Sequence, residues 1–169
     1  KSFEQCEHGN TLSWRVAEPS GISFVVEVVI TVLPDSLTQW QINITGVPED
    51  WTVFEVVFPC FDWKLDDDDR YHMLLPQDRG IDKVNPLINL PDLTELWVRR
   101  EFRKRSYPNC FATMQCFGLF DGDDYLYFAA HDPVPAVKNF YFKPDLDAKA
   151  IAMRPRVKTG WRYGEDYHS

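Results

Sequence analysis

The sequence predicts an all-β fold, an antiparallel β-sandwich with room for one short helix. Three observations support this prediction. Apolar and polar residues alternate with the strand period of two in the first half of the chain, prolines and turn residues separate these segments, and a tight-hairpin signature lies in the second half. With 169 residues, 44% of them hydrophobic, the chain can bury one sizeable core, so a single domain over residues 1–169 is expected.

Residues 22–33 form the first predicted strand, because they are rich in β-branched side chains and lie between a glycine and a proline. Residues 38–45 alternate in the same way after a short turn, so the two segments are predicted to pair as a hairpin. A third strand over residues 51–58, flanked by prolines, would complete a three-stranded meander. One apolar face of the first strand is expected to be buried: Ile22, Phe24, Val26, Val28, Ile30 and Val32.

Residues 60–91 change character, with acidic residues, prolines and turn residues, so this stretch is predicted to consist of long loops with short strands. Residues 92–104 fit two structures. Asp92 and Glu95 could form a helix capping box, whereas the apolar residues that follow alternate as in a strand. Two further strands are predicted over residues 137–143 and 149–157.

The clearest local signal is the turn 121–124, of sequence Asp-Gly-Asp-Asp, between two apolar segments. Glycine at the first central position fits a two-residue hairpin, so Phe120 is predicted to face Tyr125 and Gln115 to face Ala130. This register places four residues on one apolar face: Phe117, Leu119, Leu126 and Phe128.

Charge and composition exclude several classes of partner. The net charge of −8 makes nucleic acid and anionic membrane surfaces unfavourable, and neither is expected as a partner. No run of about 18 apolar residues occurs, so no membrane span is expected. The chain begins at Lys1 with neither methionine nor a leader, which predicts a processed precursor or a piece of a longer protein. Reduced cysteines are favoured over disulfides, because the spacing is irregular: Cys6, Cys60, Cys110 and Cys116.

His131 and Asp132 are the first candidates for chemistry, because an imidazole beside a carboxylate can act as a general acid or base near neutral pH. Asp132 precedes a proline and is equally well explained as a turn residue, with Lys138 as a structural ion-pair partner. The acidic runs 66–69 and 121–124 lack the spacing of a calcium loop, so solvated acidic loops are the better interpretation. No metal site and no cofactor are predicted.

Aromatic side chains are the group most relevant to sugars, because their faces stack on the apolar faces of pyranose rings while polar neighbours bind the hydroxyl groups. Most aromatic residues of such a chain must belong to the core, so any single one is more often packing than a ligand platform. The candidates are Trp51, Trp63, Tyr71, Trp97, Trp161 and Tyr163, with Asp62, Gln77 and Arg79 nearby in sequence.

Several short motifs follow one another along residues 37–157: Leu74-Leu75-Pro76, Arg79-Gly80, Asn85-Pro86, Tyr107-Pro108, Met114-Gln115, Asp121-Gly122, Leu126-Tyr127, His131-Asp132-Pro133 and Lys138. This set resembles the β-sandwich domain that precedes the catalytic barrel in a group of bacterial glycoside hydrolases, of the α-galactosidase and endo-α-N-acetylgalactosaminidase kind. That domain is similar to the galactose-mutarotase supersandwich. The resemblance therefore implies a supersandwich fold.

In such enzymes the catalytic carboxylates lie on a (β/α)8 barrel, which 169 residues without alternating strands and helices cannot contain. The resemblance thus implies a non-catalytic accessory domain that packs on the barrel of the same polypeptide and contacts carbohydrate. The compartment stays open, with a secreted or periplasmic location favoured over a cytoplasmic one. The candidate carbohydrate-binding residues are Trp63, Arg79, Gln115, His131, Asp132 and Lys138.

Two alternatives stay open. The chain could be an autonomous carbohydrate-binding module that uses surface tryptophans. It could also be a mutarotase-like sugar epimerase that uses His131 and Asp132, although mutarotases pair a histidine with a glutamate and His131 has no convincing glutamate partner in this sequence.

Overall fold

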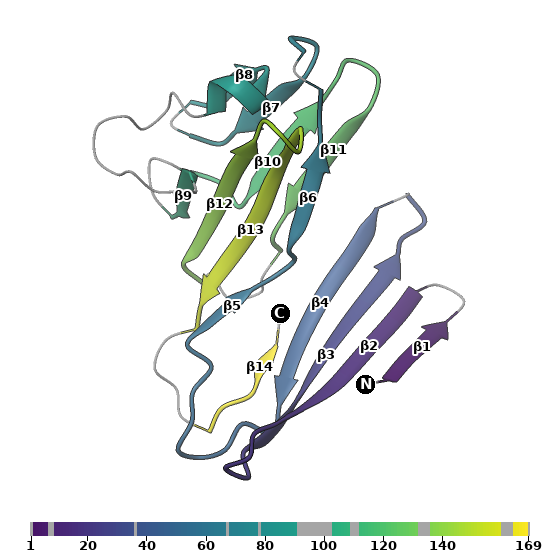
Figure 1. The fold of residues 1–169 in the computed structure, drawn as a ribbon, viewed down its shortest axis with the longest axis vertical. Coiled ribbons are helices and arrows are strands. Elements are labelled where there is room, and N and C mark those ends of the chain that lie inside the picture. Colours follow the sequence, from purple (N-terminus) through teal and green to yellow (C-terminus); the bar gives the residue numbers. More distant parts are fainter. Residues whose placement is uncertain are drawn as a thin grey trace. The chain divides into compact units, whose positions relative to one another are not determined.

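The computed structural model describes residues 2–6, 9–35, 37–66, 68–77, 79–90, 103–108, 112–131, 136–159 and 164–168. Within them the regular elements are antiparallel strands, apart from one four-residue helix, α1 (Pro86–Asn89) (Figure 1). The predicted all-β fold is therefore confirmed. The chain divides into two compact units, Lys1–Val56 with Thr159–Ser169, and Val57–Lys158. The expectation of one domain over residues 1–169 stays a prediction.

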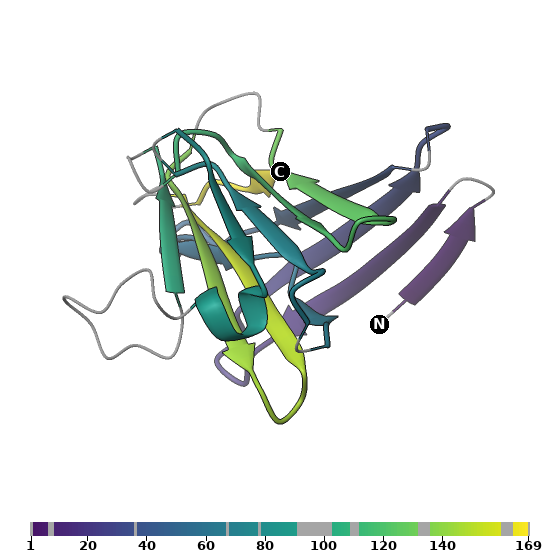
Figure 2. The same cartoon turned by 90° about the horizontal axis from the view of Figure 1, so that it is seen from above.

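The first unit is one five-stranded antiparallel sheet. Its strand order is β1 (Ser2–Cys6), β2 (Gly9–Ala17), β3 (Ser23–Val32), β4 (Thr38–Thr45) and β14 (Tyr167–His168). Figures 1 and 2 show β1 to β4 as consecutive neighbours. Val28 of β3 faces Ile42 of β4, and both are buried, at 5% and 9% exposure. The predicted hairpin of these two segments is confirmed.

Two expectations for this sheet are wrong. Residues 51–58 do not add a third strand beside β4, because β14 occupies that edge, where Tyr167 faces Ile44. Only β5 (Glu55–Val57) forms a strand there, and its neighbour is β13 (Ala150–Lys158). Alternation predicts a strand but not its partner, and here the partner comes from a distant part of the chain. The apolar face of β3 is buried only at its centre, since Val32 at the strand end is 54% exposed.

The second unit is a β-sandwich of two antiparallel sheets. One has the order β11 (Tyr125–Ala129), β10 (Cys116–Phe120), β7 (His72–Leu75) and β8 (Ile81–Val84). The other has the order β13, β12 (Lys138–Asp145) and β9 (Arg103–Tyr107), and β6 (Phe61–Lys64) also pairs with β13. The short strand β5, which ends at the first residue of this unit, adds to the β13 edge of the order. The strands predicted over residues 137–143 and 149–157 are confirmed as β12 and β13. The short strands predicted within residues 60–91 are confirmed as β6, β7 and β8.

Side chains from both sheets meet in one core. Phe117 of β10 stacks on Phe128 of β11 with 4.8 Å between ring centroids. Its ring also meets Phe140 and Phe142 of β12 edge-on, at 5.8 and 5.2 Å. The buried members of this cluster are Leu65, Met73, Leu75, Leu87, Leu90, Phe117, Leu119, Phe140, Phe142, Ile151 and Met153. Contacts across the two sheets therefore stabilise the sandwich.

The predicted β10–β11 hairpin is confirmed in its register. Phe120 faces Tyr125, and the N–H of Ala130 donates to the carbonyl of Gln115 at 2.9 Å. Gly122 has a φ of +100°, the positive value that the first central position of this turn requires.

The ambiguous segment 92–104 lies outside the described residues as far as residue 102, and β9 begins at Arg103. No helix in the described part of the chain is long and apolar enough to cross a membrane.

Candidate functional site

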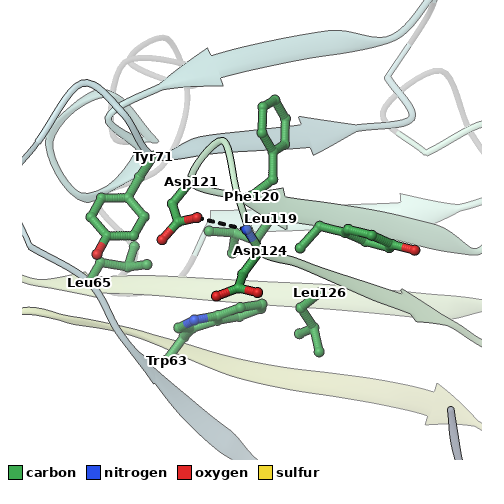
Figure 3. Close-up of a pocket in the computed structure, with 9 residues that line it drawn as sticks. Trp63, Leu65, Tyr71, Leu119, Phe120, Asp121, Asp124 and Leu126 are labelled. Atoms are coloured by element: carbon green, nitrogen blue, oxygen red, sulfur yellow. Dashed lines mark hydrogen bonds between the residues drawn. The ribbon is translucent and has the colours of Figure 1, made fainter. Parts of the chain in front are cut away.

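A small pocket opens beside the turn of the β10–β11 hairpin, within the second unit. Its volume is about 170 Å³. Figure 3 shows side chains around it from β6, from the residue before β7 and from the hairpin. The lining residues are Trp63, Leu65, Tyr71, Leu119, Phe120, Asp121, Asp124, Tyr125 and Leu126.

Strand alternation explains how two carboxylates reach this pocket. Asp121 and Asp124 lie on either side of the two-residue turn, just after the last paired residues of the two strands. Because alternate residues of a strand share a face, Asp121 points to the same inner side as Leu119, and Asp124 to the same inner side as Leu126. Two hydrogen bonds also fix the side chain of Asp121, since its Oδ1 accepts the backbone N–H of Asp124 at 3.0 Å and of Asp123 at 3.3 Å. Asp121 is thus part of the turn itself, whereas Asp124 stays exposed at the edge of the pocket.

Phe120 and Tyr125 have the opposite orientation. They face each other on the outer side of the sheet, where the ring of Phe120 stacks on His72 with 4.8 Å between centroids. Figure 3 shows the ring of Phe120 directed away from Trp63 and Leu126.

Trp63 and Tyr71 supply the aromatic walls. Trp63 lies on β6, where it faces Ile151 of β13 across the ladder and packs on the core. Tyr71 immediately precedes β7, and its carbonyl accepts the N–H of Asn85 at 2.7 Å. Both aromatic side chains are half-buried, so each keeps part of its ring accessible.

Arg70 lies outside the lining but interacts with two of the lining residues, Tyr71 and Asp121. Its guanidinium lies 3.8 Å from Asp66 and 3.6 Å from Asp68, and it donates a hydrogen bond of 2.9 Å to the hydroxyl of Tyr71. That hydrogen bond is the main reason why the pKa of Arg70 is raised. Arg70 also favours the ionised form of Asp121, but less than the backbone bonds of the turn do.

The turn predicts a pH-dependent stability. The N–H groups of Asp124 and Asp123 lower the pKa of Asp121 below its ordinary value of 3.8. The ionised form therefore stabilises the fold, fully above the ordinary pKa and progressively less as the pH falls through the lowered folded-state pKa. We expect Asp121→Asn to melt at a lower temperature than the wild type at neutral pH, and the difference to disappear in strong acid.

Differential scanning calorimetry at neutral pH and at about pH 2 measures this effect. Asp123→Asn is the matched control. It removes a carboxylate from the same turn, but the carboxylate of Asp123 does not accept the two backbone N–H groups that bind Asp121. A difference between Asp121→Asn and the wild type that stays constant down to the acidic end would contradict the assignment.

The predicted carbohydrate-binding residues are not gathered at this pocket. Trp63 lines it, whereas Arg79 is exposed between β7 and β8. Gln115 and His131 lie at the other end of the β10–β11 hairpin, where Gln115 bonds to Ala130. Gln115 is half-buried and His131 is exposed.

Lys138 begins β12 and is only 1% exposed, and its Nζ donates to the carbonyl of Ala136 at 3.3 Å. Asp132 lies outside the described residues, as does its predicted pairing with Lys138. Among the other aromatic candidates, Trp51 is 47% exposed. The rest, apart from Tyr71, lie outside the described residues: Trp97, Trp161 and Tyr163.

Sequence reasoning misses the carboxylates of the pocket, because it interprets residues 121–124 as a solvated acidic turn. The hairpin register holds a signal, since it places Asp121 and Asp124 in the rows of the inward-facing apolar residues. Their approach to Trp63 has no local signal. The sequence also gives no indication that His72 and Asp82 pair on the outer side of the sheet, with 2.9 Å between Nδ1 and Oδ2.

In the described part of the chain, no three His, Cys, Asp or Glu side chains are grouped so that they could hold a metal ion. Cys60 and Cys116 are free thiols. No protein-family model, curated protein or solved structure matches this chain.

Proposed function

We propose that this chain binds carbohydrate through the pocket beside the β10–β11 turn, as the accessory β-sandwich domain of a glycoside hydrolase. One observation carries the proposal: two aromatic walls and two carboxylates line the same small cavity. The resemblance of the sequence motifs to such domains supports the glycoside hydrolase context.

A pyranose ring suits this lining, because it has apolar C–H faces and a rim of hydroxyl groups. Trp63 and Tyr71 offer apolar ring surface to the C–H faces of the sugar. Asp121 and Asp124 can accept hydrogen bonds from its hydroxyl groups, and hydrogen bonds to a carboxylate are stronger than those between neutral groups. The volume of about 170 Å³ is below the ~300 Å³ at which pockets begin to enclose drug-sized ligands, so the proposal is for a single sugar ring.

Replacing Trp63 with leucine tests the aromatic wall. We expect Trp63→Leu to weaken sugar binding by about tenfold, because leucine keeps apolar bulk but loses the flat ring, whose specific contacts contribute up to ~1.5 kcal/mol. Calorimetric titration with glucose, galactose and their amino and N-acetylamino derivatives measures the affinity. Tyr71→Leu is expected to act in the same direction and gives a second variant at an independent position. Both side chains pack against the core, so each variant is checked for folding before its affinity is compared.

Trp51→Leu is the control, since Trp51 is 47% exposed and does not line the pocket. Melting curves show which variants are folded. If the wild type binds none of these sugars, the proposal is rejected, and if the folded Trp63 and Tyr71 variants bind as well as the wild type, the pocket is the wrong site. The enzyme context has its own test, because it requires a catalytic barrel encoded after Ser169 in the same reading frame.

A further inference from the structure

The pocket is acidic and has no cation in its lining. Asp121 and Asp124 both line it, and none of its lining residues is lysine, arginine or histidine. The carboxylate of Asp124 is exposed and makes no hydrogen bond or ion pair within the described residues. Arg70 lies outside the lining, and its charge is shared with Asp66 and Asp68. A positive group could therefore enter without displacing an existing partner of Asp124.

The lining also determines which hydrogen bonds a ligand can make. Ionised carboxylates only accept, and the hydroxyl of Tyr71 already receives a donor from Arg70. A ligand group that faces Asp121 and Asp124 must therefore bring donors. An ammonium group brings three donors and a positive charge, and the ring of Trp63 favours a cation as well. The ring of Tyr71 already has the guanidinium of Arg70 4.8 Å from its centroid. A sugar carboxylate would be repelled at the same place.

We propose that the pocket prefers an amino sugar whose amino group is free and protonated, over the N-acetylated or unsubstituted sugar of the same ring. This inference rests on the carbohydrate-binding function proposed above and names the class of sugar. The ring packs against Trp63 and Tyr71, and the ammonium group lies against Asp121 and Asp124. Acetylation removes the charge and leaves one N–H donor, while a hydroxyl group at that carbon donates one bond without charge.

Calorimetric titration of the whole chain with glucosamine, N-acetylglucosamine and glucose, and with the three galactose counterparts, tests this preference. The titration is done at about pH 6, where an amino group of ordinary pKa is protonated. We expect the amino sugars to bind about tenfold more tightly than the other two forms at low salt, as fits two partly exposed charge pairs. Salt at about 1 M should remove most of this preference, because the Debye length falls to ~3 Å.

Two variants of the same turn locate the effect. Asp124→Asn is expected to lose most of the preference for the amino sugar, because it removes the exposed carboxylate of the pocket. Asp123→Asn removes one charge from the same turn, and Asp123 does not line the pocket, so this variant should keep the preference. Both positions are exposed, and neither substitution is expected to unfold the chain.

The outcomes separate this inference from the function on which it rests. Equal affinity for all three forms of a sugar would overturn the inference and leave carbohydrate binding in place, whereas binding of no sugar would reject both. Choline binding as tightly as glucosamine would also overturn the inference, because the pocket would then select the cation without the ring. A preference that persists in Asp124→Asn, or that Asp123→Asn abolishes equally, would show that overall charge and not the pocket is responsible.

Discussion

Replacing Phe117 with alanine is expected to lower the free energy of unfolding of the second unit by about 3–5 kcal/mol. The side chain is 3% exposed, and its ring contacts those of Phe128, Phe140 and Phe142. Its strand, β10, is paired with β7 on one side and β11 on the other. Alanine would leave a cavity between the sheets that these paired strands can close only in part.

Urea denaturation followed by circular dichroism measures the loss. Leu146→Ala is the control, since Leu146 belongs to the same unit and is 62% exposed, and its truncation is expected to change the free energy of unfolding by about 0.5 kcal/mol or less. A loss for Phe117→Ala no larger than that of the control would show that the aromatic cluster is not the core of this unit.

Replacing Ile151 with alanine is expected to lower the free energy of unfolding by about 2–5 kcal/mol. Ile151 is fully buried on β13, between β12 and β6, and it faces Trp63 across the β6–β13 ladder. The cavity would therefore lie next to the aromatic wall of the pocket. We expect sugar affinity to fall as well, under conditions where the variant is still folded.

Urea denaturation measures the free energy of unfolding, and calorimetric titration measures the sugar affinity. Ile88→Ala is the control, because Ile88 lies on α1 with 45% exposure and does not line the pocket. If Ile151→Ala were as stable as Ile88→Ala, the packing of β13 in the core would be wrong. If it were unstable but bound sugar with unchanged affinity, Trp63 would not depend on this neighbour.

Local patterns were sufficient to predict the parts of the fold that are formed by neighbouring segments. The bounds of β4 agree with the predicted residues 38–45, and the register of β10 with β11 follows from Gly122 in the turn. In both cases the information lies within a few residues, because alternation defines the faces and the turn type defines the register.

Pairing between distant segments could not be predicted in this way. The short strand β14 takes the edge of β4 that residues 51–58 were expected to fill, and β5 joins β13 instead. Only two residues form β14, Tyr167 and His168, and a segment of this length has no detectable period. Partner choice depends on the whole fold, so composition alone gives no basis for it.

The candidate site illustrates the same limit. Residue type alone makes Trp63 a candidate for sugar contact, and the sequence indicates an acidic turn at Asp121 and Asp124. Their convergence depends on the pairing of β6 with β13 and on the packing of the two sheets, which bring Trp63 to the hairpin. Residue type therefore suggested the chemistry of the individual groups, and only the tertiary structure combined them.

The two-residue turn between β10 and β11 also restricts how this pocket could change during evolution. Asp121 and Asp124 belong to the pocket side because only two residues separate them. One inserted residue, taken up as a slip in register, would turn β11 over and move Leu126 to the outer face. Substitution at either aspartate changes the charge without that rearrangement. Selectivity here can thus diversify by exchange of side chains at constant length, in contrast to binding loops that diversify by insertion and deletion.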